Sequence, residues 1–191
     1  WIEDIRAFAE EFPNRVDEYE ALLTRNRIWV DRLTNVGTIS AEDALSYGLT
    51  GPNLRASGVK YDLRKEEPYM GYENYEFDVP VGEGTHGTLG DCWDRYWVRM
   101  REMMESIRII RQGCAALPGG EVMTKKQKSM YKTPMKAEAG RHAYVRCENP
   151  RGELAFYLVS DGKNAPYRCK IRGPAFCNIA LLPEISRGNL I

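Results

Sequence analysis

The residue types that most often carry catalysis are scarce in this chain of 191 residues. It contains two histidines, His86 in a glycine-rich stretch and His142 at the start of a run with strand-like alternation. A GxSxG turn or an HExxH helix would place a nucleophile or a metal ligand beside partners of defined type. Neither motif is present. We therefore interpret both histidines as structural or solvated and predict no catalytic residue in this chain.

The cysteines are equally poor candidates for a metal or cofactor site. Zinc and iron–sulfur sites normally use cysteines spaced about two to four residues apart. Here the cysteines are odd in number, scattered and without a CxxC pair: Cys92, Cys114, Cys147, Cys169 and Cys177. This spacing predicts reduced thiols, no disulfide framework and no metal-binding residue.

The glycines between Gly82 and Gly90 suggest a phosphate-binding loop, but the lysine and the serine or threonine that close such a loop are missing. Carboxylates are plentiful. None stands in an isolated apolar context of the kind that raises a carboxyl pKa. The sequence therefore predicts no cofactor-binding residue.

Charge also excludes some partners. Lysine plus arginine and aspartate plus glutamate both number 27, so no general field attracts nucleic acid or an acidic membrane. The local exception is the alternating triplet Arg168, Lys170 and Arg172, which a strand would place on one face within about 14 Å. Such cations repel unless something anionic or polar faces them. We expect this face to meet a partner or acidic groups of this chain, with a plain wet face as the alternative.

The chain shows no run of about 20 apolar residues that could span a bilayer, and no signal-peptide region. Because it starts at Trp1 without a methionine, we expect an internal segment of a longer protein.

Residues 1–50 are predicted to be helical. Apolar residues recur at helical spacing over 2–12, and Pro13 is typical of the first turn of a second helix. Ser40, followed by acidic residues, predicts a helix start, and Gly48 a helix end. Residues 51–90 are rich in glycine, proline and tyrosine, which predicts extended loops with a short strand at 75–79.

Asp91 is predicted to cap the long helix, at about 91–117. Its apolar stripe recurs at spacings of three and four: Trp93, Trp97, Met100, Met104, Ile107, Ile110, Cys114 and Leu117. A lysine-rich linker follows over 118–141. Strands at 142–147, 153–160 and 166–172, separated by turn residues, predict an antiparallel three-stranded meander at about 142–172, followed by a short helix near the end of 142–191. Apolar residues on both sides of the central strand predict cover on two faces. The fold class is therefore α+β, and the residues alone show no self-contained active site.

Ordered runs of sequence now resemble a known family: NRIW at 26–29, SAEDAL at 40–45, LRASG at 54–58, YDLRK at 61–65 with Pro68-Tyr69, FDVPVG at 77–82, GDCWDRY at 90–96, PRGEL at 150–154, YLVSDG at 157–162 and PYRCKIR at 166–172 with PAF at 174–176. They are similar to the 49 kDa-type, or D-subunit, family of the NADH–quinone oxidoreductase, respiratory complex I. The likeness covers nearly the whole chain.

The resemblance implies a middle segment, 1–191, of the quinone-site subunit, in electron transfer from NADH to quinone coupled to ion translocation. The implied partners are other complex I subunits, especially the small iron–sulfur subunit, with which it would enclose the quinone. NADH, flavin and iron–sulfur clusters would lie on other subunits, peripheral to the cytoplasmic side of the inner (plasma) membrane. Residues of the matching runs are candidates to face the partner or the chamber: Arg55, Asp91, Asp94, Arg95, Arg151, Arg168, Lys170 and Arg172.

The sequence also departs from the family. The loop from Gly82 to Gly90 is longer than the family's usual link, and the stretch between Gly120 and His142 lacks a helix that many members have. The family's quinone-contacting histidine and tyrosine have no counterpart in this segment. Two other interpretations remain open: a non-catalytic assembly paralogue, and the large subunit of a related membrane-bound hydrogenase or formate hydrogenlyase, whose metal-binding cysteines are missing here.

Overall fold

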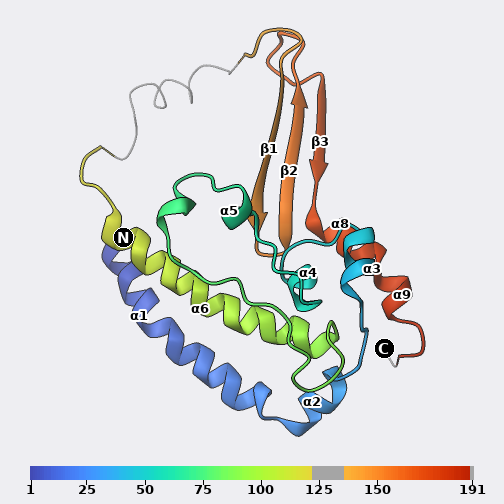
Figure 1. Ribbon diagram of the computed structural model, residues 1–191. Helices are drawn as coiled ribbons and strands as arrows, with labels where there is room; N and C mark the ends of the chain where they lie inside the picture. The colour runs from blue at the N-terminus through green and yellow to red at the C-terminus, as the bar shows by residue number, and fades with distance from the viewer. Residues whose placement is uncertain (122–135, 190–191) are drawn as a thin grey trace.

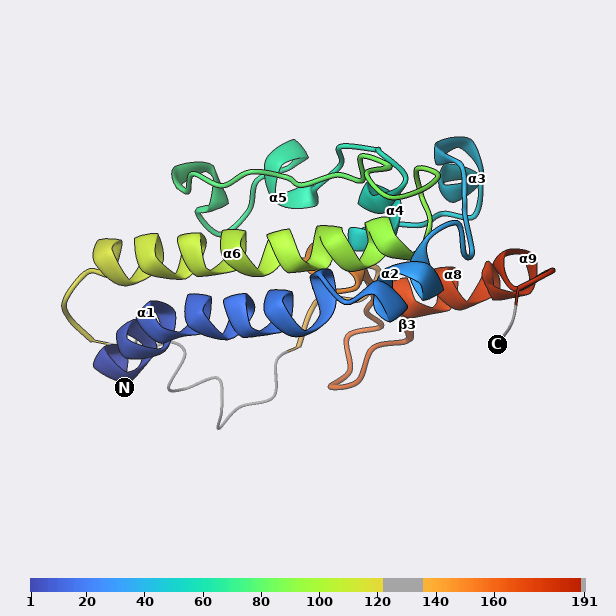
Figure 2. The same cartoon turned by 90° about the horizontal axis from the view of Figure 1, so that it is seen from below.

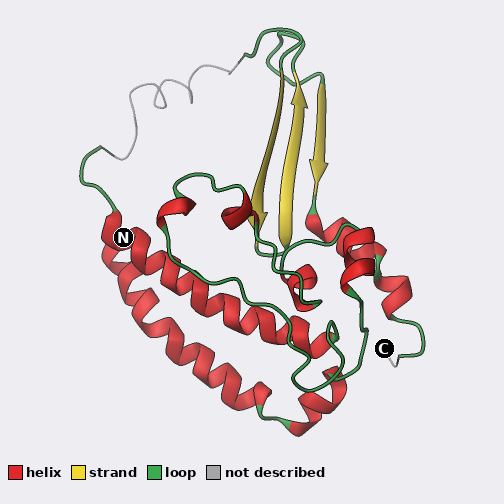
Figure 3. Cartoon of the chain, in the orientation of Figure 1, coloured by secondary structure: helices red, strands yellow, loops and turns green. Residues whose placement is uncertain are grey.

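The computed structural model describes residues 1–121 and 136–189. Helices form a body from which a three-stranded sheet projects (Figures 1 and 3). This confirms the predicted α+β class. The predicted linker at 118–141 falls largely on 122–135, which lie outside the described residues.

The N-terminal helix α1, Ile2–Tyr19, runs through Pro13 without interruption. The prediction of two helices divided at Pro13 is therefore wrong. Proline lacks the amide that would bind the carbonyl of Ala9, four residues earlier. That carbonyl instead accepts a hydrogen bond of 2.9 Å from Arg111 Nη2, so the helix continues. A π-helical turn, Glu20–Thr24, and helix α2, Arg27–Leu33, follow.

The long helix α6, Cys92–Ala116, lies antiparallel beside α1 (Figures 1 and 2). Asp91 caps it as predicted, accepting from the Asp94 amide at 3.0 Å. Three of the eight residues of the apolar stripe are buried, namely Trp93, Met100 and Ile107. Met104, by contrast, is 40% exposed. The predicted cap of helix α3, Ala41–Ser46, is also confirmed, because Ser40 Oγ accepts from the Asp43 amide.

The segment 51–90 is more structured than expected. It contains helices α4, Pro52–Ala56, and α5, Leu63–Glu66, and a 3₁₀ turn, Tyr72–Asn74. The predicted strand at 75–79 is wrong, because within the described residues this stretch has no strand partner. Side chains of α6 satisfy its amides instead: Gln112 Oε1 binds the Glu76 amide and Glu105 Oε2 binds the Asp78 amide, both at 2.9 Å.

The meander is confirmed as strands β1, His142–Asn149, β2, Gly152–Val159, and β3, Arg168–Arg172, paired in the order β1-β2-β3. Helices α8, Pro174–Ala180, and α9, Leu182–Ile185, follow. The expectation that β2 is covered on two faces is wrong for its second half. Ala155 is buried, but Phe156 and Leu158 are 39% and 38% exposed, because the strands extend beyond the helical body (Figure 1).

Candidate functional site

Among the basic residues predicted to face the partner or the chamber, Arg55 is the most buried, with 2% of its surface exposed. It lies in α4 and reaches two other elements. Its Nε donates to Glu102 Oε1 of α6 at 2.6 Å, and its Nη1 donates to Glu148 Oε1 of β1 at 3.0 Å. Nη1 also donates to the carbonyl of Tyr61 at 2.9 Å. A single guanidinium therefore joins the long helix to the base of the sheet.

Further charges complete this cluster. Asp62 lies 3.7 Å from Arg55 and makes a closer pair with Arg64 at 2.6 Å. Burial works against the charge of Arg55, but the carboxylates of Glu102, Glu148 and Asp62 raise its pKa above the ordinary value. Burial would raise the pKa of Asp62, yet hydrogen bonds and charge from Arg64 hold it lower.

Glu148 responds differently. Its side chain is 4% exposed, and burial raises its pKa despite the charge of Arg55. The cluster thus holds one carboxyl whose pKa lies above its ordinary value, although this group is itself paired with Arg55. The prediction that no carboxylate has such a setting is wrong for Glu148. No local pattern marks this burial, because it depends on Arg55 of α4, the Leu63 amide of α5 and Tyr69, which lie far away along the chain.

Asp91 and Asp94 clamp the loop that precedes α6. Asp94 is fully buried and accepts from the amides of Glu83, Gly84 and Gly90 at 3.0–3.3 Å. Asp91 Oδ2 accepts from the Asn35 amide at 2.8 Å. The loop at 82–90 therefore folds back onto the start of α6. His86, on this loop, lies edge-on to Trp93.

Arg95 secures the same region from the next helical turn. It donates to the carbonyls of Gly90 and Gly37, each at 2.7 Å, and lies 3.0 Å from Cys92 Sγ. Its guanidinium is thus occupied by groups of this chain. Four of the candidate side chains thus form hydrogen bonds to other parts of this chain: Arg55, Asp91, Asp94 and Arg95.

Arg151 and Arg172 lie beside a crossing at the base of the sheet, where the backbones of Gly152 and Thr50 approach closely. Arg172 donates to the carbonyls of Glu153, at 2.7 Å, and Gly48, at 2.8 Å. Arg151 is exposed on the turn between β1 and β2. Beside it, a Cβ on Gly152 would lie 2.5 Å from Thr50 Oγ1, so only glycine fits this crossing.

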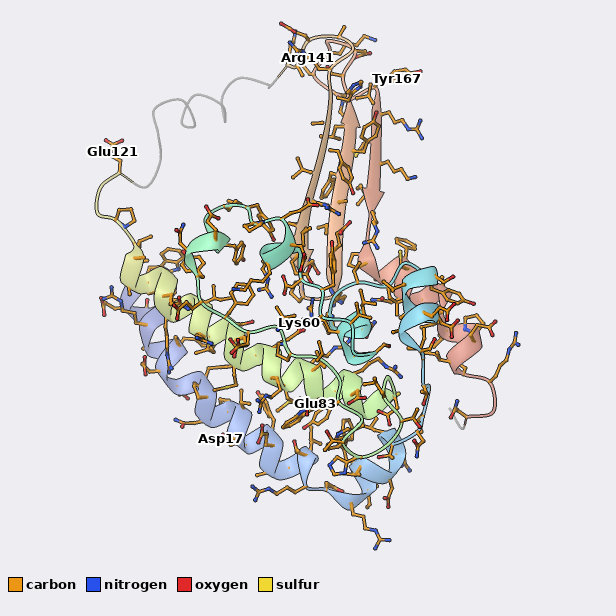
Figure 4. All side chains as sticks on the ribbon, in the orientation of Figure 1. Asp17, Lys60, Glu83, Glu121, Arg141 and Tyr167 are labelled. Carbon is orange, nitrogen blue, oxygen red and sulfur yellow. The ribbon has the colours of Figure 1, made fainter. Side chains whose placement is uncertain are left out.

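Arg168 and Lys170 share a face with Arg172, as predicted, because they pair with Val159, Tyr157 and Ala155 of β2 at alternate positions. Their environments differ. Arg172 is half-buried at the body, whereas Arg168 and Lys170 are exposed on the projecting part of the sheet. The triplet is therefore not one uniform surface. In Figure 4, Arg141 and Tyr167 mark the outer end of this projection.

Two features are absent from the described ranges, 1–121 and 136–189. No group of three or more histidine, cysteine, aspartate or glutamate residues is arranged to hold a metal ion there. No helix in these ranges is long and apolar enough to cross a membrane.

Comparison with known proteins gives a consistent result. Residues 1–191 match the family model described as the respiratory-chain NADH dehydrogenase 49 kDa subunit. The chain is 45% identical over 212 residues to an NADH-quinone oxidoreductase D-subunit of Opitutus terrae, covering 100% of this chain and 48% of that protein. For the D-subunit of Methylacidiphilum infernorum the identity is 46%, with coverage of 100% and 49%. For the D-subunit of Paramagnetospirillum magneticum it is 44%, with coverage of 100% and 52%. The chain spans about half the length of these relatives.

Proposed function

Because this chain belongs to the family of the respiratory-chain NADH dehydrogenase 49 kDa subunit, we propose that it forms part of the quinone-site subunit of an NADH–quinone oxidoreductase. In this role it helps to enclose the quinone together with the subunit that carries the terminal iron–sulfur cluster. NADH, flavin and the clusters belong to other subunits, and the chain itself contributes no cofactor ligand. The assembly is peripheral, on the cytoplasmic side of the membrane, and couples electron transfer to ion translocation.

The observation that carries this proposal is the match over the whole chain, at 44–46% identity, to proteins named as D-subunits of NADH-quinone oxidoreductase. The fold supports a structural role for this segment within that subunit. Arg55 and its carboxylates fix α4, α6 and β1 to one another. Asp94 fixes the loop before α6. Such buried, hydrogen-bonded charges hold a wall in one geometry, which an enclosed ligand site requires.

A chimera tests the proposal. Residues 1–191 replace the 210 aligned positions in the D-subunit of Paramagnetospirillum magneticum, in cells that lack their own copy of that subunit. We expect membranes from these cells to regain NADH–quinone reductase activity that a quinone-site inhibitor blocks.

Two outcomes contradict the proposal. A chimera that assembles with the other subunits but leaves turnover at the deletion background supports the non-catalytic assembly role instead. A chimera that does not join the complex, although it folds and accumulates, removes the subunit role altogether. Cells in which the unmodified gene is restored provide the reference activity.

A further inference from the structure

Within the part of the chain that the structure describes, the outer half of the sheet is less covered than its inner half. Near the body, Ala155 is buried and Glu153 is 6% exposed. Further out, Tyr144 is 58% exposed and Ile171 is 57% exposed. A sheet with an apolar face normally packs that face against another element.

One face of this outer half is apolar. The register aligns Val145, Phe156 and Ile171 across the three strands, and Leu158 with Cys169 in the next row. Val145 is 64% exposed, and the other residues of these rows are exposed as well. No Asp, Glu, Lys or Arg belongs to either row. A contiguous apolar patch of this kind marks a surface that another layer covers.

The opposite face carries cations along its whole length. Only the cations of the inner half bind acceptor groups of the described chain. On the inner half, Arg146 pairs with Glu153 at 3.2 Å, and Arg172 donates to the Glu153 carbonyl. On the outer half, no carboxylate among the described residues lies within ion-pair distance of Arg168 or Lys170. Among the described residues, carboxylates therefore lie near this face only on its inner half, which is also the half that the helical body covers.

The described residues thus leave the outer half without a full apolar layer on one face and without carboxylates at Arg168 and Lys170 on the other. A membrane surface offers both chemistries, but it is one plane and can meet only one face of a sheet. A polypeptide can pass over both faces. The relatives have polypeptides about twice as long as the part that matches this chain, and a covalently linked segment acts at high effective concentration.

We infer that, in the full-length D-subunit polypeptide, segments outside the matched stretch cover both faces of the outer half of the sheet, with an apolar surface on Val145, Phe156 and Ile171 and carboxylates at Arg168 and Lys170. This inference rests on the proposed function for the identity of the polypeptide. It is a statement about packing, so it can fail while the catalytic role stands.

The same chimera, purified without other subunits, tests the inference through two natural reporters. Cys169 reports the apolar face by its rate of maleimide labelling, with the chimera in guanidinium chloride as the unprotected reference. Lys170 reports the cationic face by its acetylation relative to Lys60, an exposed lysine of the body. We expect Cys169 to react at least about tenfold more slowly than the reference, and Lys170 to be protected relative to Lys60.

Other outcomes overturn the inference. Free reactivity at both sites shows uncovered faces, and protection at one site shows that only one face is covered. Protection that requires the complete complex assigns the cover to another subunit. Protection that requires phosphatidylglycerol vesicles assigns it to the membrane. Loss of quinone turnover with both sites protected would remove the proposed function but retain this packing.

A second measurement is independent of chimera folding. The chain is co-expressed with the two unmatched parts of the same relative as separate polypeptides. We expect them to co-purify with the unchanged chain and with Lys60→Glu, but at least about fivefold less with Lys170→Glu combined with Ile171→Asp. Equal recovery with all three versions overturns the inference, and so does recovery with none of them.

Discussion

Arg111 of α6 donates to the carbonyl of Ala9, the group that Pro13 leaves without an amide partner in α1. A residue from a neighbouring helix thus supplies the hydrogen bond that proline removes. This allows α1 to continue past a residue that usually ends or kinks a helix.

Replacing Arg111 with alanine should lower the free energy of unfolding by about 1–2 kcal/mol, because it orphans this carbonyl. In a Pro13→Ala background the cost should be smaller, since an alanine at this position supplies its own amide. Guanidinium denaturation of both single variants and the double variant measures the coupling. Arg108→Ala, which removes ion pairs with the exposed Glu76 and Asp78 and with the partly buried Glu105, is the control and should cost under about 1 kcal/mol. Equal costs in the two backgrounds would refute the account.

Arg55→Met should destabilise the fold by about 3–5 kcal/mol, because it leaves buried carboxylates without a cation. The loss should depend on pH. Without Arg55, the folded pKa of Glu148 rises further above its unfolded value. Such a group stabilises the fold below the unfolded pKa, and this contribution disappears as pH rises through the folded pKa.

The deficit of Arg55→Met relative to the unchanged chain should therefore be smaller at about pH 5 than at about pH 8. Denaturation at both values checks the sign. Arg101→Met, on the exposed surface of α6, should show no such trend. A deficit that grows toward acid pH would contradict the electrostatic explanation.

Gly90→Ala should be much more harmful than Gly48→Ala. Both glycines have positive φ, +89° and +70°. A Cβ on Gly90, however, would lie 2.1 Å from the carbonyl oxygen of Ile39, whereas nothing lies within 4 Å of one on Gly48. We expect about 1 kcal/mol for Gly48→Ala from its backbone conformation and at least about 2 kcal/mol more for Gly90→Ala. Thermal melts of the pair isolate the steric part, and equal melting temperatures would exclude it.

Charge reversal should have different effects at the different cations of β3. Arg172→Glu should destabilise the chain itself, because Arg172 binds the carbonyls of Gly48 and Glu153. Arg168→Glu combined with Lys170→Glu should cost the chain under about 1 kcal/mol. The same pair should reduce incorporation of the chimera into the oxidoreductase, as measured by co-purification. Normal incorporation and turnover would show that neither another subunit nor a further segment of the same polypeptide depends on these two cations.

The purified 191-residue chain should contain no stoichiometric metal, flavin or iron–sulfur cluster, and it should show no quinone reductase activity. Enclosed sites obtain their affinity by burying most of the ligand, which requires walls from other segments and subunits. Elemental analysis, a visible spectrum and titration with a quinone-site inhibitor test these expectations. One equivalent of iron, nickel or zinc, or tight saturable binding of the inhibitor, would overturn them.

The sequence predicted correctly those features that depend on residues close together along the chain. Ser40 and Asp91 cap helices because a side chain binds an amide three residues ahead. The meander follows from alternation and turn residues. The failures depend on partners distant in sequence. The continuation of α1 needs Arg111, and the burial of Glu148 needs Arg55, so neither pattern was visible in a short window of sequence.

The Arg55 guanidinium has a mechanical consequence as well. The same guanidinium is bound to Glu148 of β1 and to Glu102 of α6. Its two hydrogen bonds therefore restrain how far the base of the sheet can turn relative to the axis of α6. Removing Arg55 would release this restraint at both ends at once.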